Sequence, residues 1–478
     1  MSAPRTRSTA MSTPAGATGA PRRELHLAAF FPFGPHYDWT SVADPTTYYD
    51  AETYAALARS AERGLFSAMF LGDSQRLREH LGRVNDTVVT GRPDQLVLFA
   101  NLAARTRHLG FVATLNTTFA APADLAARVA TVDRLSGGRA GWNVVTTNDA
   151  WTGANFRRGG YLPRSERYRS AEEHLAIVHA LWDAEQGTTV RRSGAHHDVV
   201  AAATLPPSVQ GAPVIFQAGE SDEGRDFAAR HAEGIFSRYL EAPPAAAFAA
   251  DLRRRLVAHG RPADDLRIFP AASITLGDTE AEAREKAEWF HRRTWTDRMV
   301  VAVIEAVWGR DLSWLDPDGP LPDVDPVSAE QTRTHGVVNS RDNPVETAAA
   351  WRRVSAEQGL TVRALVDSLH AAAAFVGTPS SVADRLAASV RAGELDGLNL
   401  TPQSVPDGFD DVVDRLVPEL QERGVYRTRY PGTTLRENLG LRAPVHHRLR
   451  AGGGMTPARC RSMTPARCRS MAPGGRAP

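Results

Sequence analysis

The feature that most constrains the fold is a regular alternation of short apolar runs with longer helical patterns. Eight runs have the length and composition of buried strands, and most are separated by segments with apolar residues at helical spacing. Strands that alternate with helices favour a parallel sheet with right-handed crossovers, and eight such units predict an α/β fold, a closed (β/α)8 TIM barrel. The eight runs are Leu25–Phe31, Ser67–Asp73, Leu109–Asn116, Ala140–Thr146, Pro213–Gly219, Gly234–Ser237, Arg267–Leu276 and Leu395–Thr401.

The alternative architecture is an open doubly wound sheet. Its Gly-x-Gly-x-x-Gly fingerprint is absent, because Phe33-Gly34-Pro35-His36 follows the first run. Residues 294–375 break the alternation with a Pro- and Asp-rich stretch, so we expect a large insertion near the barrel mouth, before the last strand. The barrel is expected over residues 24–444. A disordered tail (1–23) precedes it, and a disordered tail with a tandem MTPARCRS repeat (445–478) follows.

The composition excludes several function classes. The formal net charge of +1 gives no field to attract nucleic acid or an anionic membrane. No run approaches the ~18 apolar residues of a membrane span, and the N-terminal stretch lacks the apolar core of a secretory signal. Both cysteines, Cys460 and Cys468, lie in the C-terminal tail. The body therefore offers no disulfide or thiolate nucleophile, which suits the cytoplasm, and redox chemistry requires a bound cofactor.

Polar side chains follow several of the predicted strands. They include Asp73, Thr114, Asn116, Asn143, Thr146–Asp149, Gln217, Asn399 and Thr401. Capping of the next helix explains any one of them. The whole set favours a pocket, because the reactive face of a parallel barrel lies at the carboxyl ends of its strands. One strand end, "QAGESDEG" (Gln217–Gly224), also opens a helix after a glycine turn, an arrangement that binds phosphate.

Two histidine pairs are conceivable metal ligands. His196 and His197 are adjacent, and neighbouring side chains on regular structure point in different directions. His446 and His447 lie in the basic C-terminal tail. We therefore expect no metal site.

Several stretches together resemble one family. The "SGGRAGWNVVTTND", "SERYRSAEEH", "PVIFQAGESDEG" and "TLRENLGL" motifs occur in order, and the likeness covers residues from about 25 to 444. The chain resembles bacterial-luciferase-like, FMN-dependent monooxygenases of the nitrilotriacetate monooxygenase, dibenzothiophene-sulfone monooxygenase and pristinamycin synthase A group. The resemblance implies a two-component enzyme that takes FMNH2 from a separate NAD(P)H:flavin reductase. With O2 it oxygenates a small-molecule substrate, and it forms a homodimer or homotetramer.

The resemblance also implies cofactor-binding residues. Flavin contacts fall on Asp73 in "FLGDS", Thr114 in "VATLN", Tyr168 in "RYRSAEEH", and Ser221 with Asp222 in "AGESDEG", and Asn143 in "GWNVV" is expected to line the pocket. Arg164 stands where the family usually has a histidine, and its guanidinium can hold a phosphate.

The remaining expectations concern chemistry and substrate access. His36 and His80, in loops after strands, are candidates for a catalytic acid or base. Phe30, Phe70 and Trp142 are candidates for the walls of a dry pocket. The segment from Asp183 to Ala212 is shorter than is usual in the family, so relatives do not define the substrate. Two alternatives stay open, namely a deazaflavin-dependent oxidoreductase of the same fold and a non-catalytic flavin-binding barrel.

Overall fold

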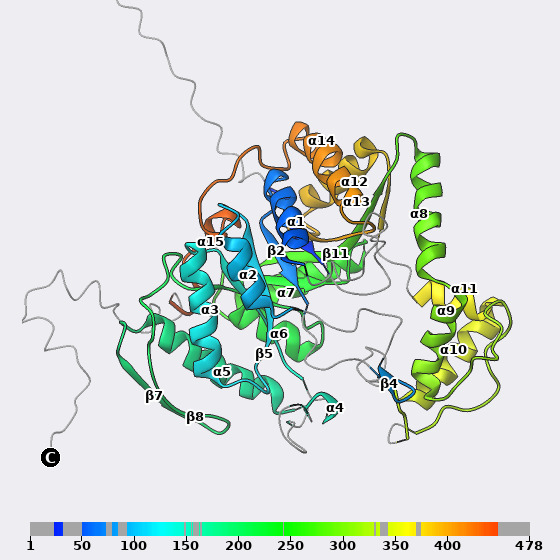
Figure 1. Ribbon diagram of the computed structural model, residues 1–478, viewed down its shortest axis with the longest axis horizontal. Coiled ribbons are helices and arrows are strands. Elements are labelled where there is room, and N and C mark those ends of the chain that lie inside the picture. Colours follow the sequence, from blue (N-terminus) through cyan, green and yellow to red (C-terminus); the bar gives the residue numbers. More distant parts are fainter. Residues whose placement is uncertain are drawn as a thin grey trace, which may run out of the picture.

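The computed structural model describes residues 23–31, 50–72, 79–84, 93–147, 150–153, 155, 162, 165–241, 243–328, 331–334, 343–369 and 374–447. Its centre is a parallel sheet in the order β10-β9-β6-β5-β2-β1-β13-β11, which closes on itself because β10 also pairs with β11. This is the predicted closed eight-stranded barrel, and each predicted run contributes one strand (Figure 1). The barrel strands are β1 (His26–Phe30), β2 (Ala68–Leu71), β5 (Gly110–Asn116), β6 (Ala140–Val145), β9 (Val214–Gln217), β10 (Gly234–Ser237), β11 (Arg267–Leu276) and β13 (Gly397–Pro402).

Helices cover the outside of the barrel, and their ends carry the expected signals. The carboxylate of Asp50 caps α1 by accepting from the backbone N–H of Thr53 at 2.9 Å. Helix α3 ends at Gly137, whose φ of 71° is the left-handed conformation that favours glycine. The covering helices are α1 (Ala51–Arg63), α2 (Gln95–Ala103), α3 (Pro122–Ser136), α5 (Arg167–Asp183), α6 (Asp222–His231), α7 (Pro244–Ala258), α8 (Glu280–Thr294), α12 (Pro379–Ala392) and α14 (Val417–Glu422).

The smaller elements lie in the connections. Two antiparallel hairpins, β3–β4 and β7–β8, and the strand β12 alongside β11 were not predicted. Their bounds, with those of the short helices, are β3 (Glu79–His80), β4 (Arg83–Val84), α4 (Ala150–Gly153), β7 (Thr189–Ser193), β8 (Asp198–Ala202), β12 (Ala374–Gly377), α13 (Asp407–Asp411), the π-helical turn Val412–Leu416 and α15 (Leu435–Asn438). None of the described helices combines the length and apolar character that crossing a bilayer requires.

The barrel interior is filled by aromatic side chains. Phe70 stacks on Phe30 at 4.8 Å and on Phe236 at 4.2 Å between ring centroids, and Phe216 and Phe269 complete the cluster. Leu435 and Leu439, from α15 and the residue after it, join the same cluster. They meet the glycines near the starts of β5 and β6, so they close the amino-terminal end of the barrel. The other end is left to polar side chains.

Trp142 corrects one expectation. Its ring packs edge-on against His174 and Trp182 of α5, and its Nε1 donates to the Leu115 carbonyl at 3.1 Å. Neighbouring residues of a strand face opposite sides, so Trp142 fills the layer between barrel and helices while Asn143 faces the interior. Trp142 therefore does not line a pocket, whereas Phe30 and Phe70 do face the interior.

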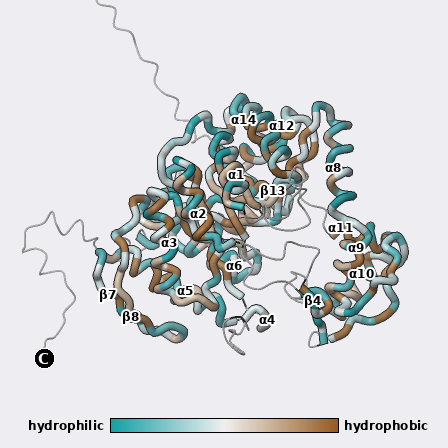
Figure 2. The backbone as a smooth tube through the Cα atoms, in the orientation of Figure 1, coloured by the Kyte–Doolittle hydropathy of each residue, from teal (hydrophilic) through white to brown (hydrophobic). Residues whose placement is uncertain are grey.

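The insertion expected at 294–375 forms a helical unit with its own core. Helices α9 (Asp297–Trp308), α10 (Pro344–Gln358) and α11 (Val362–Leu369) bury a separate apolar cluster that includes Val300, Ile304 and Trp308. Helix α8 leads the chain away from the barrel to this unit, seen at the right of Figure 1. Apolar segments gather in the barrel and again in this unit (Figure 2).

The packed chain continues past Pro444. Val445 is buried, and the imidazoles of His446 and His447 both contact Asp183 at the end of α5. The boundary expected at 444 therefore falls three residues before the last described residue. Arg436 fixes the preceding segment through a buried ion pair with Glu233 and hydrogen bonds to the carbonyls of Gln210 and Ala212.

Candidate active site

Thr114 and Asn143 lie side by side at the carboxyl ends of β5 and β6. They are register partners, and the Nδ2 of Asn143 donates to the Oγ1 of Thr114 at 3.1 Å. The Oγ1 of Thr114 in turn donates to the Leu71 carbonyl of β2 at 2.8 Å. These bonds connect three adjacent strands, so two predicted site residues lie in one rigid arrangement.

Gln95 at the start of α2 completes this arrangement and was not predicted. Pairing between β2 and β5 ends at Leu71 with Ala113, so the next peptide groups of β5 on that side lack a strand partner. The Gln95 side chain takes that place, since its Oε1 accepts from the Thr114 N–H at 2.8 Å and its Nε2 donates to the Thr114 carbonyl at 3.2 Å. A buried glutamine as the first residue of a helix was the only signal in the sequence.

Three of the buried oxygen atoms on barrel strands have no hydrogen-bond partner among the described residues. They are the Oδ1 of Asn143, the Oδ1 of Asn399 and the Oγ of Ser273. All three residues alternate with outward-facing neighbours in step with the interior phenylalanines, so they face the barrel interior. An unsatisfied buried acceptor costs about 1–3 kcal/mol. Such acceptors fit a ligand that carries N–H and hydroxyl donors, as a flavin ring and its ribityl chain do.

The second part of the site is a cradle formed by Tyr168, Gly219, Ser221 and Gly224. A Cβ on Gly219 would lie 2.7 Å from the Oη of Tyr168, and a Cβ on Gly224 would lie 2.8 Å from the same atom. The hydroxyl therefore occupies space that only two glycines leave open. The ring of Tyr168 is held by Phe227, at 5.4 Å between centroids, and by the guanidinium of Arg167 over its face at 4.9 Å.

Ser221 is the N-cap of α6. Its Oγ accepts from the Gly224 N–H at 3.2 Å, which turns the first residues of α6 into a helix start beside the Tyr168 hydroxyl. The amino end of a helix presents free N–H groups and a partial positive charge, and it binds phosphate readily. The cradle therefore fits an anionic group such as the phosphate of FMN.

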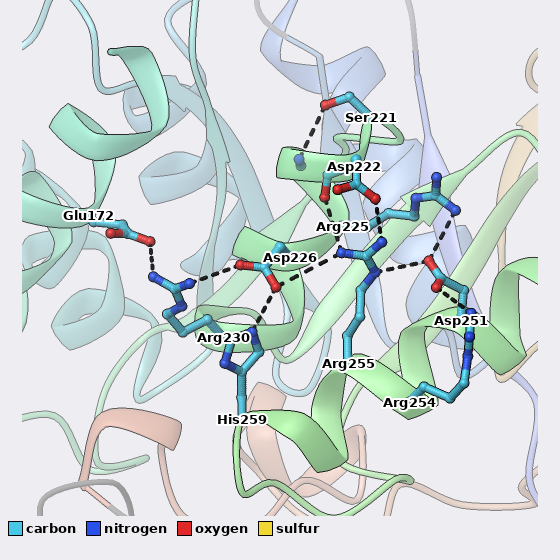
Figure 3. Close-up of polar contacts among 11 residues, drawn as sticks. Glu172, Ser221, Asp222, Arg225, Asp226, Arg230, Asp251, Arg254, Arg255 and His259 are labelled. Carbon is cyan, nitrogen blue, oxygen red and sulfur yellow. Dashed lines mark hydrogen bonds and ion pairs between the residues drawn. The ribbon is translucent and has the colours of Figure 1, made fainter. Parts of the chain in front are cut away.

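The side chain of Asp222 points away from this helix start, toward α7 (Figure 3). Its carboxylate is paired with Arg255, which also binds Asp251 at 3.0 Å. Asp222 therefore offers the site its backbone N–H, because its side chain is committed to the α6–α7 contact.

The same network continues along α6. Asp226 accepts from His259 at 2.8 Å and pairs with Arg230 at 2.9 Å (Figure 3). Although burial opposes its ionisation, the hydrogen bond and charge of His259 and the charges of the arginines hold the pKa of Asp226 below its usual value. These charges lock α6 against α7 and so fix the helix start.

Of the remaining predicted residues, Asp73, Arg164 and His36 lie outside the described part of the chain. His80 is described, on the hairpin β3–β4, where its Nε2 contacts the Oε2 of Glu305 in α9 at 2.6 Å. The Leu81 N–H in the same hairpin donates to the Oγ1 of Thr334 at 3.1 Å. These contacts give His80 a role in holding the hairpin against the insertion.

Comparisons with known proteins agree with this geometry. The sequence profile described as luciferase-like monooxygenase matches residues 33–395. The chain is 36% identical to one of the subunits of pristinamycin IIA synthase from Streptomyces pristinaespiralis, over 89% of this chain and 98% of that protein. It is 32% identical to nitrilotriacetate monooxygenase component A of Aminobacter aminovorans, over 88% and 97%.

A solved structure gives the same result. The crystal structure of a riboflavin lyase, determined with modified FMN and riboflavin as substrate, superposes with a TM-score of 0.70 at 28% identity. The alignment covers 88% of this chain and 97% of that one.

Proposed function

Because the chain belongs to the luciferase-like monooxygenase family, we propose that it is the oxygenase component of a two-component, FMNH2-dependent monooxygenase. A separate NAD(P)H:flavin reductase supplies the reduced flavin, and O2 and a small organic molecule are the substrates. Two relatives are named as one part of a larger enzyme, the nitrilotriacetate and pristinamycin proteins, and these names support a second component. We place the enzyme in the cytoplasm as a homodimer or homotetramer, as in the relatives that the sequence resembles.

The observation that carries this proposal is the cradle at the start of α6, together with the partnerless oxygens of the barrel interior. In the proposed complex, Tyr168, Ser221 and the first N–H groups of α6 hold the FMN phosphate, with Arg164 as a further phosphate ligand. Thr114 and Asn143 position the ring, and Asp73 is a further contact. Bound FMNH2 supplies the electrons that activate O2.

The protein contributes orientation and a dry environment. Phe30, Phe70 and Phe236 form a continuous apolar stack below the polar strand ends. Such a floor keeps water away from the reacting centre, where water would divert the oxidant. Asn143 holds one face of the site because its Nδ2 is fixed by Thr114 and its Oδ1 is left for the ligand.

Two substitutions test the flavin site. Tyr168→Phe removes the hydroxyl that lies against Gly219 and Gly224 while keeping the ring in place. If that hydroxyl binds a phosphate, its loss costs about 1.5–3 kcal/mol, or roughly 10- to 150-fold in FMNH2 affinity. Ser221→Ala removes the cap of α6 and should weaken binding in the same direction. Tyr239→Phe is the matched control, since Tyr239 also packs on a phenylalanine, Phe248, but outside the cradle.

The measurement is an anaerobic titration with FMNH2 and, in parallel, with a reduced deazaflavin. Unchanged FMNH2 affinity in both variants would place the flavin elsewhere. Binding of the deazaflavin alone would favour the deazaflavin-dependent oxidoreductase. A protein that binds FMNH2 but consumes O2 without oxygenating any substrate supplied with a reductase would be the non-catalytic barrel.

A further inference from the structure

Asp183, His446 and His447 form a cluster outside the proposed flavin site. The Nε2 atoms of His446 and His447 lie 3.0 and 2.5 Å from the same oxygen, the Oδ1 of Asp183. Within the described part of the chain, this is the one group of three potential ligands whose donor atoms all lie within 4.8 Å of one another. The cluster joins the end of α5 to the last described turn, so residues far apart in sequence converge on one point.

The cluster is remote from the proposed chemistry. Tyr168 is the second residue of α5 and Asp183 is the last. At 1.5 Å per residue, the helix separates them by about 22 Å. The cluster therefore lies toward the amino-terminal face of the barrel, where stability rather than catalysis is usually served.

The packing around the cluster holds the ligand atoms in place. His179, one turn before Asp183 on α5, stacks on His446 at 3.9 Å between ring centroids and 8° between planes. Pro444 packs against Gly211, where a Cβ would come within 2.9 Å of the proline ring. His446 and Asp183 are largely buried, while His447 is 37% exposed, which leaves one side open to solvent.

Two imidazole nitrogens and a carboxylate oxygen are a ligand set that zinc favours, at about 2.0–2.2 Å from the metal. Around a tetrahedral ion at that distance, ligand atoms lie about 3.4 Å apart. The two nitrogen–oxygen distances, 3.0 and 2.5 Å, are within about 1 Å of this value, so small side-chain shifts would admit the ion. Water would fill the open fourth position on the side of His447.

We propose that Asp183, His446 and His447 bind a divalent transition-metal ion of the zinc class, which fastens the C-terminal segment to the amino-terminal face of the barrel. Hard cations such as Mg²⁺ bind weakly, because two of the three ligands are imidazoles. The competing explanation is a metal-free contact in which both histidines donate to Asp183. The experiment separates the two explanations.

The full chain is stripped with a chelator and titrated with Zn²⁺ against a chromogenic zinc indicator, and thermal unfolding is followed in parallel. One equivalent should bind per chain and raise the melting temperature by several degrees, whereas Mg²⁺ should not. Asp183→Asn keeps an oxygen acceptor for the histidines but removes the charged ligand. It should fold, yet lose at least tenfold in Zn²⁺ affinity, as should His447→Asn.

Two controls exclude other ligands. The titration is repeated in the Cys460→Ser/Cys468→Ser chain, because thiolates are strong zinc ligands. His291→Asn removes a histidine of a simple surface pair, with Asp367 at 3.0 Å, and should leave Zn²⁺ affinity unchanged. Failure of the unaltered chain to bind Zn²⁺ would overturn the proposal. So would equal affinity in Asp183→Asn, or binding that disappears with the cysteines alone. FMNH2 affinity is expected to stay unchanged throughout, so this test is independent of the proposed function.

Discussion

Replacing Gly219 by alanine should disturb the cradle directly. The new Cβ would lie 2.6 Å from the Nε2 of Gln217 and 2.7 Å from the Oη of Tyr168, and the Cα of Gly224 lies 3.0 Å away. Ordinary contacts begin near 3.4 Å, so the methyl group overlaps the two side-chain atoms by about 0.8 and 0.7 Å. Because the backbone of Gly224 blocks retreat, the side chains of Gln217 and Tyr168 must move.

Overpacking of this kind costs about 1–3 kcal/mol. Because FMNH2 is proposed to bind the displaced hydroxyl, the cost should reach the binding equilibrium as a loss of roughly 5- to 150-fold. Anaerobic titration measures this loss, and thermal unfolding of the flavin-free chain measures any general destabilisation. In combination with Tyr168→Phe, which removes one of the two overlaps, the effects should be smaller than their sum.

Gly260→Ala is the control for general destabilisation. Gly260 has a φ of +71° and open space around its Cβ position, so alanine there costs about 1–2 kcal/mol of backbone strain away from the cradle. It should lower stability and leave FMNH2 affinity intact. The reasoning fails if Gly219→Ala binds FMNH2 within twofold of the unaltered chain, or if Gly260→Ala loses as much affinity.

Two further predictions concern stability. Burial, with the charge of His197 second, lowers the pKa of His174 to about 3 from 6.5, so below about pH 6.5 the unfolded chain takes up a proton that the native state refuses. The free energy of unfolding should therefore fall by up to about 1.4 kcal/mol per pH unit between pH 6 and pH 4, and His174→Phe should flatten this slope in urea titrations. Arg436→Met breaks the buried pair with Glu233 and should cost about 3–5 kcal/mol, whereas Arg238→Met at an exposed pair should cost at most about 1 kcal/mol. Similar losses in both arginine variants would contradict this account.

The sequence was sufficient to predict the barrel because each strand and helix has its own local pattern. All eight predicted runs became barrel strands, and the polar residues at their ends include Thr114 and Asn143, which the structure brings into contact. The glycine turn and Ser221 also predicted the start of α6. Period, turn residues and caps act over a few neighbouring residues, so they can be recognised in one dimension.

Only the tertiary structure decided which way individual side chains face and which distant groups meet. Both faces of a barrel strand are buried, so the apolar run in β6 does not distinguish the outward Trp142 from the inward Asn143. The pairing of Asp222 with Arg255, and of His80 with Glu305, depends on how α7 and the insertion pack. The meeting of Asp183 with His446 and His447 likewise requires closure of the whole barrel, because a contact across more than 260 residues leaves no local pattern in the sequence.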